Sequence, residues 1–358
     1  MQLELVKYHG LGNDFLVLAV RDAGVRGAGH PADACGGMAP IADGSLARAL
    51  CDRHYGIGAD GLLVVRALGP GRVAMELFNG DGGVAETSGN GLRCAALAAV
   101  EEHLVDGPEM DVETLAGTVH AAVAPGPDPG GADVRVEMGI VEVGPELGLD
   151  ELPEPDPSRL PALSGGTGAG SWGSVLASLA GRRARRVAVG NPHLVLYADP
   201  GARSAPTPPG HGVVARIDEV GPALEAGVEG GVNVELVEVR AQDASLGLEV
   251  WERGVGVTLA CGSGSCAAAA AARAAGLVGD VVEVANPGGT LVVELSGDPA
   301  AASAVLTGPA RRVGRIVVDR DELFRAAPGP SPELSHWSIR RSRDRRRGHN
   351  ARSLPGAR

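Results

Sequence analysis

The feature that most constrains the fold is a repeated segment, in which a polar residue and a Gly-x-Gly turn precede a run of small apolar residues. The first copy begins at Ser88 (SGNGLRCAALAA) and the second at Cys261 (CGSGSCAAAAAA). A helix that is apolar on nearly every side must be enclosed by other elements. Each copy therefore predicts a buried central helix, and the two together predict two similar domains, each a sheet wrapped around its helix.

Strand-like segments outnumber helical ones between and around the two copies, which favours an α+β fold with mostly antiparallel sheets over alternating βαβ units. We place an N-terminal domain at residues 1–123 with about 309–326, a C-terminal domain at 124–308, and a disordered Arg-rich tail at 327–358. The Pro- and Gly-rich segment Pro125–Asp133 is the predicted linker between the domains. A second such stretch, 145–181, is predicted to be a surface insertion.

Composition excludes several classes of function. The 358 residues contain no apolar run of about 18 or more, so we expect no membrane span, and the N-terminus lacks the layout of a signal peptide. A net charge of −12 argues against nucleic acid as the main partner. Five cysteines without framework or metal-ligand spacing predict free thiols, no metal site and a cytoplasmic protein.

The repeated helix starts carry a specific chemistry. Gly-x-Gly at a helix start leaves several backbone N–H groups free at the positive end of the helix dipole, where an anion binds. Two such starts facing each other would hold one carboxylate, with Ser88 and Cys261 on either side of the neighbouring carbon. A thiol at a helix N-terminus has a lowered pKa. Removal of a proton from one face and delivery to the other would invert that carbon without pyridoxal phosphate or metal.

At this point the sequence resembles the diaminopimelate epimerases, over about residues 1–320. The motifs that carry the resemblance are Tyr8-His-Gly-Leu-Gly-Asn-Asp-Phe15, Asp52-Arg-His-Tyr-Gly-Ile-Gly-Ala-Asp60, Asn79-x-Asp81-Gly82, Ser88-Gly-Asn-Gly-x-Arg93-Cys94, Gly190-Asn-Pro-His193, Asn233, Glu252-Arg-Gly254, Ala260-Cys-Gly-Ser-Gly264, Pro287-Gly-Gly289 and Thr307-Gly-Pro-Ala310. The resemblance implies a pseudo-symmetric two-domain fold with a cleft between the domains. It also implies epimerisation of LL-2,6-diaminopimelate to the meso form, on the route to lysine and peptidoglycan precursors. It implies no cofactor and a small amino acid as the substrate. Whether the protein forms a homodimer is left open.

The same resemblance assigns residues to roles. Cys261 occupies the second catalytic position, and Ser88 stands where the family has its first catalytic Cys. The remaining predicted contacts are the backbone of Gly89, Asn90, Gly262 and Ser263 for the reacting α-carboxylate, and Asn13, Asn79, Asn191, Asn233, Glu252 and Arg253 for the distal amino-acid end. A distal ammonium and carboxylate need an acidic partner, an Arg fork and neutral amides. Two further departures are Gly83 in place of a Ser and Val257 in place of a Glu.

Several alternatives remain at this stage. His193 is either a structural histidine or part of the site, and Cys94 and Cys266 are expected to be small buried thiols. A Ser/Cys pair would also suit a racemase for another amino acid, or a dehydratase that uses Cys261 as its main base. A third alternative is a silent paralogue that binds an amino acid or a partner protein, which the intact Cys261 turn disfavours. The Arg-rich tail is either a solvated end or a patch that binds an anionic surface.

Overall fold

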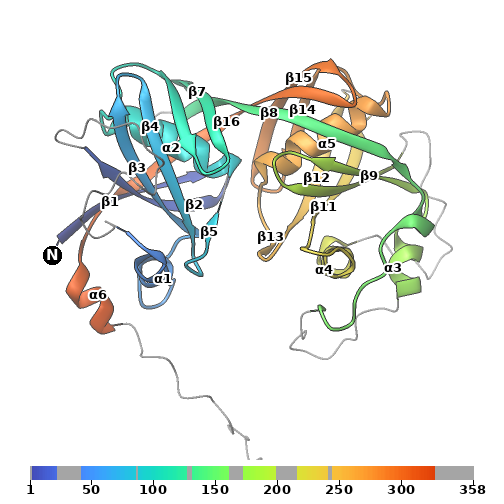
Figure 1. Cartoon of the computed structure of the whole chain (residues 1–358), viewed down its shortest axis with the longest axis horizontal. Coiled ribbons are helices and arrows are strands. Elements are labelled where there is room, and N and C mark those ends of the chain that lie inside the picture. Colours follow the sequence, from blue (N-terminus) through green and yellow to red (C-terminus); the bar gives the residue numbers. More distant parts are fainter. Residues whose placement is uncertain are drawn as a thin grey trace, which may run out of the picture.

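The protein forms two halves of similar construction, each with a curved sheet around one central helix (Figure 1). The structure is a computed structural model that describes residues 2–21, 42–85, 88–126, 131–160, 172–198, 216–240 and 244–326. The predicted tail at 327–358 lies outside these residues, as do Cys35 and part of the stretch 145–181. In the part of the chain that is described, no helix is long and apolar enough to cross a membrane.

The helices and strands divide between the two halves in chain order. The first half contains β1 (Gln2–Gly10), β2 (Asn13–Val20), α1 (Gly44–Cys51), β3 (Gly61–Gly69), β4 (Arg72–Asn79), β5 (Val84–Ala85), α2 (Gly89–Glu101), β6 (Glu109–Thr114) and β7 (Gly117–Pro125). The second half contains a 3₁₀ turn (Leu149–Glu151), α3 (Trp172–Ser178), β9 (Arg182–Ala188), β10 (Pro192–Ala198), α4 (Ile217–Gly227), β11 (Asn233–Arg240), β12 (Ser245–Glu252), β13 (Gly256–Val257), α5 (Gly262–Ala274), β14 (Val281–Asn286) and β15 (Gly289–Asp298). Two long strands, β8 (Gly131–Leu147) and β16 (Ala301–Asp319), belong to both halves, and α6 (Arg320–Ala326) follows β16.

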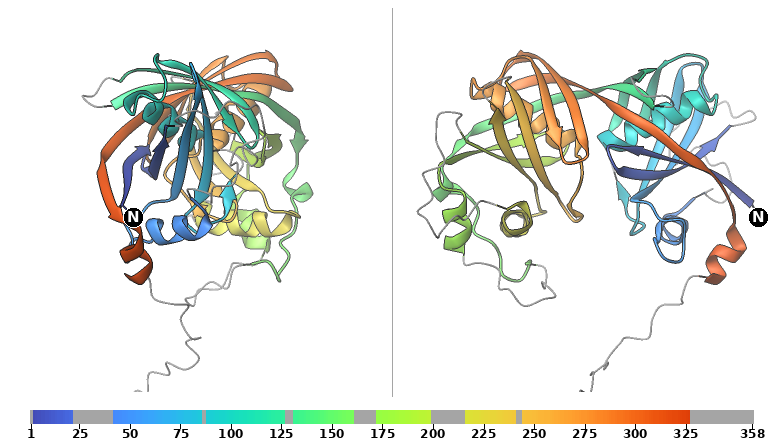
Figure 2. Two further views of the ribbon diagram at one scale, coloured as in Figure 1. Left: turned by 60° about the vertical axis from the view of Figure 1, so that its left-hand side comes forward. Right: turned by 180° about the vertical axis from the view of Figure 1, so that it is seen from behind.

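The two long strands join the halves into one continuous sheet (Figures 1 and 2). β8 pairs with β7 near its start, where Val136 lies opposite Ala121, and with β9 further on, where Val143 lies opposite Val187. β16 runs the opposite way, from the second half to the first: its start pairs with β15 and its end pairs with β1. β8 and β16 also pair antiparallel with each other, so the halves are connected by a two-stranded ribbon.

The predicted linker at Pro125–Asp133 is not where the chain passes between the halves. Pro125 pairs with Ala132, so β7 and β8 form adjacent antiparallel strands of the first half. Val134 and Val136 pack in the core around α2, whereas Val141 packs in the core around α5. The chain therefore changes halves inside β8, next to the register shift at Gly139, and the prediction failed because a Pro/Gly-rich segment also suits a connection between neighbouring strands.

The two central helices are enclosed as their sequences predict. Ala95 to Ala99 of α2, apart from the slightly exposed Leu97, have no exposed surface, and neither does most of the alanine run 267–272 of α5. Small side chains allow the surrounding strands to approach the helix closely on all sides, which lets a short sheet close around it. Each helix is thereby held rigidly with its N-terminus toward the other half.

A second layer of helices covers the outer faces of both halves. α1 packs through Leu46 and Leu50 on a cluster that includes β3, and α4 packs on β11 and β12. The stretch 145–181 is only in part a surface insertion, because Leu152, Val175 and Leu179 are buried in the same cluster as α4. Their apolar side chains are separated by enough Gly, Ser and Pro to conceal the pattern in the sequence.

Candidate active site

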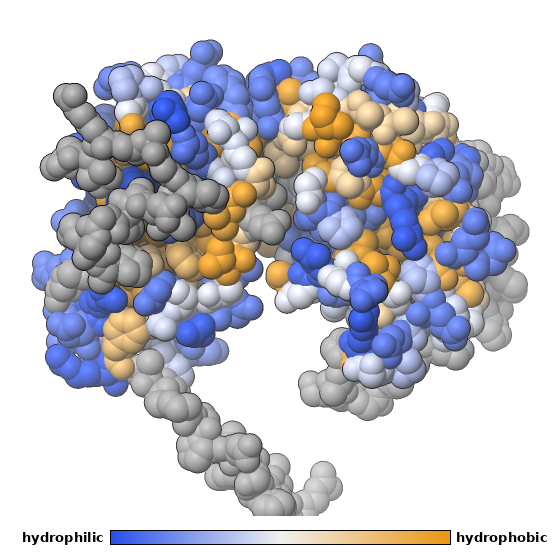
Figure 3. Space-filling model, in the orientation of Figure 1, coloured by the Kyte–Doolittle hydropathy of each residue, from blue (hydrophilic) through white to orange (hydrophobic). Residues whose placement is uncertain are grey.

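A cavity of about 580 Å³ lies between the halves, and Figure 3 shows the molecule hollowed at this place. Side chains of both halves line it. All twelve residues predicted for the site are among them: Asn13, Asn79, Ser88, Gly89, Asn90, Asn191, Asn233, Glu252, Arg253, Cys261, Gly262 and Ser263. Residues separated by up to about 250 positions in the sequence are thus brought to one place, while their individual roles remain predictions.

The first turns of α2 and α5 form equivalent parts of the cavity wall. Ser88 is the N-cap of α2, and its Oγ accepts a hydrogen bond from Gly91 N at 3.1 Å. Cys261 is the N-cap of α5, and its Sγ accepts one from Gly264 N at 3.3 Å. Both caps have extended backbones, as capping residues usually do. The two candidate acid/base groups therefore occupy the same position on two opposed helices.

The two helix starts touch each other through glycine. A Cβ added at Gly262 would lie 3.0 Å from the Cα of Gly89 and 2.9 Å from a methyl carbon of Leu306. A Cβ at Gly89 would lie 3.1 Å from the Cα of Gly262. Any larger residue would force the helices apart, so these glycines allow the free N–H groups of both first turns to converge on one volume. That arrangement suits a carboxylate.

Asn90 connects the halves at this point. Its side-chain Nδ2 donates to the main-chain oxygen of Ala260 at 2.7 Å and lies 3.1 Å from Oδ1 of Asn13. Ala260 directly precedes Cys261, so the Asn90 side chain at the start of α2 is hydrogen-bonded to the segment that leads into α5. Since Asn90 is almost fully buried, the bond is shielded from water.

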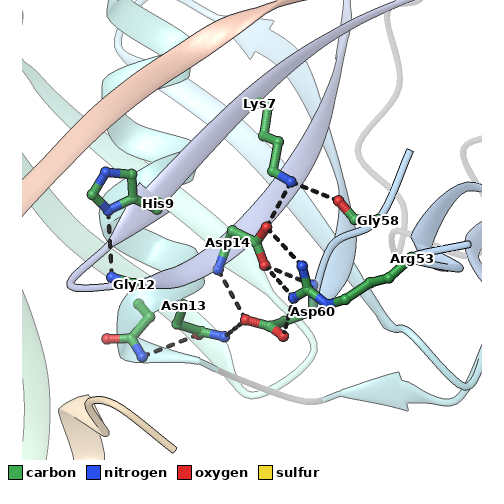
Figure 4. Close-up of polar contacts among 9 residues, drawn as sticks. Lys7, His9, Gly12, Asn13, Asp14, Arg53, Gly58 and Asp60 are labelled. Carbon is green, nitrogen blue, oxygen red and sulfur yellow. Dashed lines mark hydrogen bonds and ion pairs between the residues drawn. The ribbon is translucent and has the colours of Figure 1, made fainter. Parts of the chain in front are cut away.

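Figure 4 shows how Asn13 is held against the cavity. Its Nδ2 donates to Asp60 at 2.7 Å, and Asp60 forms an ion pair with Arg53 at 2.9 Å. Asp14 lies between Arg53 and Lys7, at 2.8 and 2.7 Å. Burial alone would raise the pKa of Asp14, but hydrogen bonds from Arg53 and Lys7 outweigh it and lower that pKa. Sequence reasoning missed this network, although four of its members lie within the motifs that carry the resemblance.

Cys261 lies in a more acidic environment than its position alone predicts. Burial and the nearby carboxylate of Glu252 raise the pKa of the Cys261 thiol well above its usual range, although Ser263 and Gly264 N lower it. The expectation of a lowered pKa at a helix N-terminus was therefore wrong for this closed site. The dipole of one helix does not offset loss of water together with a nearby negative charge. A pKa raised in this way keeps the Cys261 thiol protonated near neutral pH.

Glu252 is positioned by Thr258 beside this thiol. Thr258 Oγ1 donates to Glu252 Oε1 at 2.6 Å, and the carboxylate also interacts with Cys261. Burial raises the pKa of Glu252 against the effect of these hydrogen bonds. Next to it, Arg253 N donates to Asn233 Oδ1 at 2.8 Å, and the Arg253 side chain is exposed at the rim. Glu252 thus faces the Cys261 thiol, whereas the next residue, Arg253, lies at the outer edge of the cavity.

A second buried carboxylate lies behind α5. Glu235 Oε1 is 2.6 Å from His193 Nδ1, both side chains are fully buried, and His193 Nε2 is 2.8 Å from Asn191 Oδ1. Burial raises the pKa of Glu235, although His193 opposes the shift. His193 therefore contacts the cavity through Asn191. Sequence reasoning missed Glu235 because a charged residue among the apolar residues of β11 is usually expected to face solvent.

The other cysteines of the described residues are small buried thiols, which confirms the expectation for Cys94 and Cys266. Cys51, Cys94 and Cys266 are free and buried. Burial raises the pKa of each to about 12, so they are unreactive near neutral pH. Within the described ranges, no three His, Cys, Asp or Glu side chains are placed together as metal ligands.

Comparison with known proteins identifies the family. The sequence profile of diaminopimelate epimerase matches residues 5–143 and 186–313. The chain belongs to the diaminopimelate epimerase family. It is 35% identical over 315 residues to the diaminopimelate epimerase of Desulforudis audaxviator, covering 87% of this chain and 97% of that protein. It is 36% identical over 324 residues to that of Erythrobacter litoralis, covering 89% and 98%.

Solved structures show the same fold at low sequence identity. A phenazine biosynthesis protein of the PhzF family from Bacillus anthracis superposes with a TM-score of 0.57 at 13% identity, covering 89% of this chain and 99% of that one. A hydroxyproline epimerase from Agrobacterium vitis, with bound trans-4-hydroxy-L-proline, superposes with a TM-score of 0.53 at 18% identity, covering 91% and 94%. The two-half architecture is thus shared more widely than the diaminopimelate epimerase sequence.

Proposed function

We propose that this protein is an isomerase that converts LL-2,6-diaminopimelate to meso-diaminopimelate, without an added cofactor, in the biosynthesis of lysine and peptidoglycan precursors. Relatives named diaminopimelate epimerase, more than 30% identical over most of the chain, support the substrate. The observation that carries the chemistry is the pair of N-capping side chains, Ser88 and Cys261, at two helix starts that meet in one cavity.

Substrate binding follows from the convergence of backbone donors. The N–H groups of Gly89, Asn90, Gly262 and Ser263 would bind the reacting α-carboxylate, which leaves the α-carbon between the two capping side chains. Arg253 at the rim, together with amide side chains, would bind the distal end. Glu252, which the sequence predicts for the same end, lies beside Cys261, and we assign it to proton transfer instead. A charged fork and neutral amides match a carboxylate and an ammonium group.

Proton transfer differs between the two faces. The raised pKa of the Cys261 thiol keeps it protonated near neutral pH, so it can deliver a proton to a carbanion. To act as base it must first transfer its proton, and the Glu252 carboxylate, whose raised pKa makes it a stronger proton acceptor, lies beside it. The thiol then becomes a thiolate and Glu252 becomes a carboxylic acid, with no net change of charge.

Ser88 would be the acid/base group on the opposite face of the substrate. A hydroxyl is a much weaker acid than a thiol, so its alkoxide forms only at high cost, even with support from the helix dipole. Proton delivery from Ser88 to a strongly basic carbanion is easier than proton removal by its alkoxide. We therefore propose a functional but slow epimerase whose two directions of proton exchange are unequal.

Proton exchange in deuterium oxide tests the proposal. The purified full-length protein, without added pyridoxal phosphate or metal, is incubated with LL-diaminopimelate, meso-diaminopimelate, L-proline and L-alanine, and loss of the α-proton signal is followed by NMR. The proposal predicts exchange and inversion of diaminopimelate alone. Exchange of L-proline or L-alanine at a similar kcat/KM would indicate a different racemase, and exchange without inversion would indicate a one-sided reaction.

A further inference from the structure

Arg93 is the largest side chain without exposed surface in the described part of the protein. It lies in the second turn of α2, and its guanidinium donates to Gly89 O at 3.2 Å, Asn90 Oδ1 at 2.8 Å and Pro309 O at 3.4 Å. All three acceptors are neutral, and no carboxylate of a described residue forms an ion pair with it. A buried cation without a counterion is costly to maintain, which calls for a physical reason.

One glycine makes room for this guanidinium. A Cβ at Gly10 of β1 would lie 2.9 Å from Arg93 Nη2. A Cβ at Gly308 of β16 would meet Leu291 first and would lie at an ordinary contact distance, 3.4 Å, from Arg93 Nε. β1 is therefore shaped around the cation, which lies beneath the first turn of α2.

The cation lies where positive potential already accumulates. The N-termini of α2 and α5 meet at Gly89 and Gly262, and each carries the positive end of a helix dipole. Arg93 lowers the pKa of Cys266 of α5, against the larger effect of burial, so its charge acts on a residue of the second helix as well. Burial lowers the pKa of Arg93 to about 10, which leaves it protonated at neutral pH. Two helix dipoles and one buried cation thus create a positive potential at the helix starts, and a bound carboxylate would balance it.

Arg93 also determines the orientation of Asn90. Because Nη2 donates to Asn90 Oδ1, the Asn90 amide must direct its Nδ2 away from Arg93, toward the main-chain oxygen of Ala260. The position corresponding to Arg93 in the second repeat is Cys266. A single cation in the first half therefore connects, through Asn90, to the residue that precedes Cys261 in the second.

We propose that Arg93 is a positioning residue that locks the two helix starts into one carboxylate-binding site and supplies the positive charge that the substrate's α-carboxylate balances. The inference rests on the proposed function, because the anion is the reacting carboxylate of the amino acid. Charge on that carboxylate grows as the α-proton leaves, so a fixed cation behind it stabilises the transition state more than the bound substrate.

The first test compares Arg93→Lys with Arg93→Met. Both variants lose the guanidinium fork, but only the Lys variant keeps a positive charge. Because that buried charge also affects stability, melting temperatures are measured and kcat/KM is compared per folded molecule. We expect Arg93→Met to lower kcat/KM for LL-diaminopimelate by at least about 100-fold, and Arg93→Lys to retain at least about ten times more activity than the Met variant. Equal kcat/KM in the two variants, or wild-type activity in the Met variant, would overturn the role of the charge.

The second test keeps Arg93 and displaces it. Gly10→Ala introduces a methyl group against Nη2, the atom that orients Asn90, whereas Gly314→Ala on β16 has open space and serves as the matched control. We expect Gly10→Ala to lower kcat/KM by about fivefold or more, and the control to stay within about twofold. Equal activity of the two alanine variants would refute the positioning role, and this pair decides the matter if neither Arg93 variant folds.

Wild-type activity separates the two proposals. Absence of exchange of LL-diaminopimelate by the wild-type protein would contradict the proposed function, and the inference would fall with it. An active wild type with unaffected Arg93 and Gly10 variants would contradict only the inference.

Discussion

The first turns of α2 and α5 have similar backbones but different chemical surroundings. Ser88 and Cys261 cap their helices with the same type of hydrogen bond. Cys261 lies beside Glu252 and near Glu235, whereas the half that contains Ser88 holds the buried cation Arg93. Among the described residues, the Ser88 hydroxyl makes a single hydrogen bond, with Gly91 N.

This contrast shows that a repeated fold does not require a repeated chemistry. The backbone symmetry places the two capping side chains at equivalent positions in one cavity, and inversion needs two groups on opposite faces of one carbon. The proton affinity of each group is then set by its own neighbours, through burial and nearby charges. In this protein the two capping side chains differ both in the atom that each presents and in the surrounding charge.

Removal of the thiol should have the largest effect. Cys261→Ala should lower α-proton exchange by about 100- to 10,000-fold, because a positioned acid/base group is lost. Cys266→Ala, within the same helix, is the control and should leave exchange nearly unchanged. The measurement is deuterium incorporation from both stereoisomers. A Cys261→Ala variant that keeps more than about a tenth of wild-type exchange would show that Cys261 is not the acid/base group.

Loss of the Glu252 carboxylate should slow α-proton exchange less than loss of the thiol, and it should speed alkylation of Cys261. Glu252→Gln removes a charge that raises the pKa of the Cys261 thiol. The thiol pKa should fall, so iodoacetamide should alkylate Cys261 faster at pH 8, while exchange slows by about 30-fold for lack of the proton acceptor. Glu249→Gln, on the exposed side of β12, is the control. Slower alkylation, or unchanged exchange, would remove Glu252 from the mechanism.

The acid side of the pH profile follows from the same carboxylate. Burial raises the pKa of Glu252, and only its ionised form accepts the proton of Cys261. Exchange catalysed by the wild-type protein should therefore decline as the pH falls through this raised pKa, at a higher pH than for an exposed carboxyl group. Initial rates of exchange between pH 5 and 8 measure the decline, and Glu252→Gln should lose it. The same acid limb in both proteins would assign it to another group.

The rim of the cavity should affect substrate choice more than chemistry. Arg253→Met should lower kcat/KM for diaminopimelate by about tenfold, because a charged hydrogen bond of about 1.5 kcal/mol is lost. Any weak exchange of L-alanine, which has no distal end, should not change. An equal loss for both amino acids would mean that Arg253 acts on the reacting centre or on folding.

The smallest expected effect concerns stability. Ser88→Ala removes an N-cap, at a cost of about 1 kcal/mol in the free energy of unfolding. Asp43→Ala removes the cap of α1, where Asp43 Oδ1 accepts from Leu46 N at 2.8 Å, and should cost about the same. Thermal unfolding compares the two. The Asp43 variant should keep its activity, so a Ser88 variant that does the same would be only a helix cap.

Local patterns predict the fold class and the two helix starts of the cavity, whereas the other cavity residues are predicted through the resemblance to the diaminopimelate epimerases. Gly-x-Gly before an alanine-rich run specifies a helix start wherever it lies, and two copies specify two opposed starts. Glu235, Arg93 and the crossing at Gly139 could not be predicted, since each depends on contacts between distant segments. The raised pKa of Cys261 was missed for the same reason, because the burial and the carboxylate that cause it come from the folded site.

The most direct test of the unequal faces compares exchange from the two stereoisomers in wild type and Ser88→Cys. Initial α-proton exchange in deuterium oxide is measured by NMR, starting separately from LL- and meso-diaminopimelate. Our account predicts unequal initial rates for the wild-type protein. It predicts faster and more nearly equal rates for Ser88→Cys, because a thiol with a pKa of about 8.5 ionises far more readily than a hydroxyl and so can serve as both acid and base. Equal rates in the wild type, or a Ser88→Cys variant no faster than wild type, would contradict it.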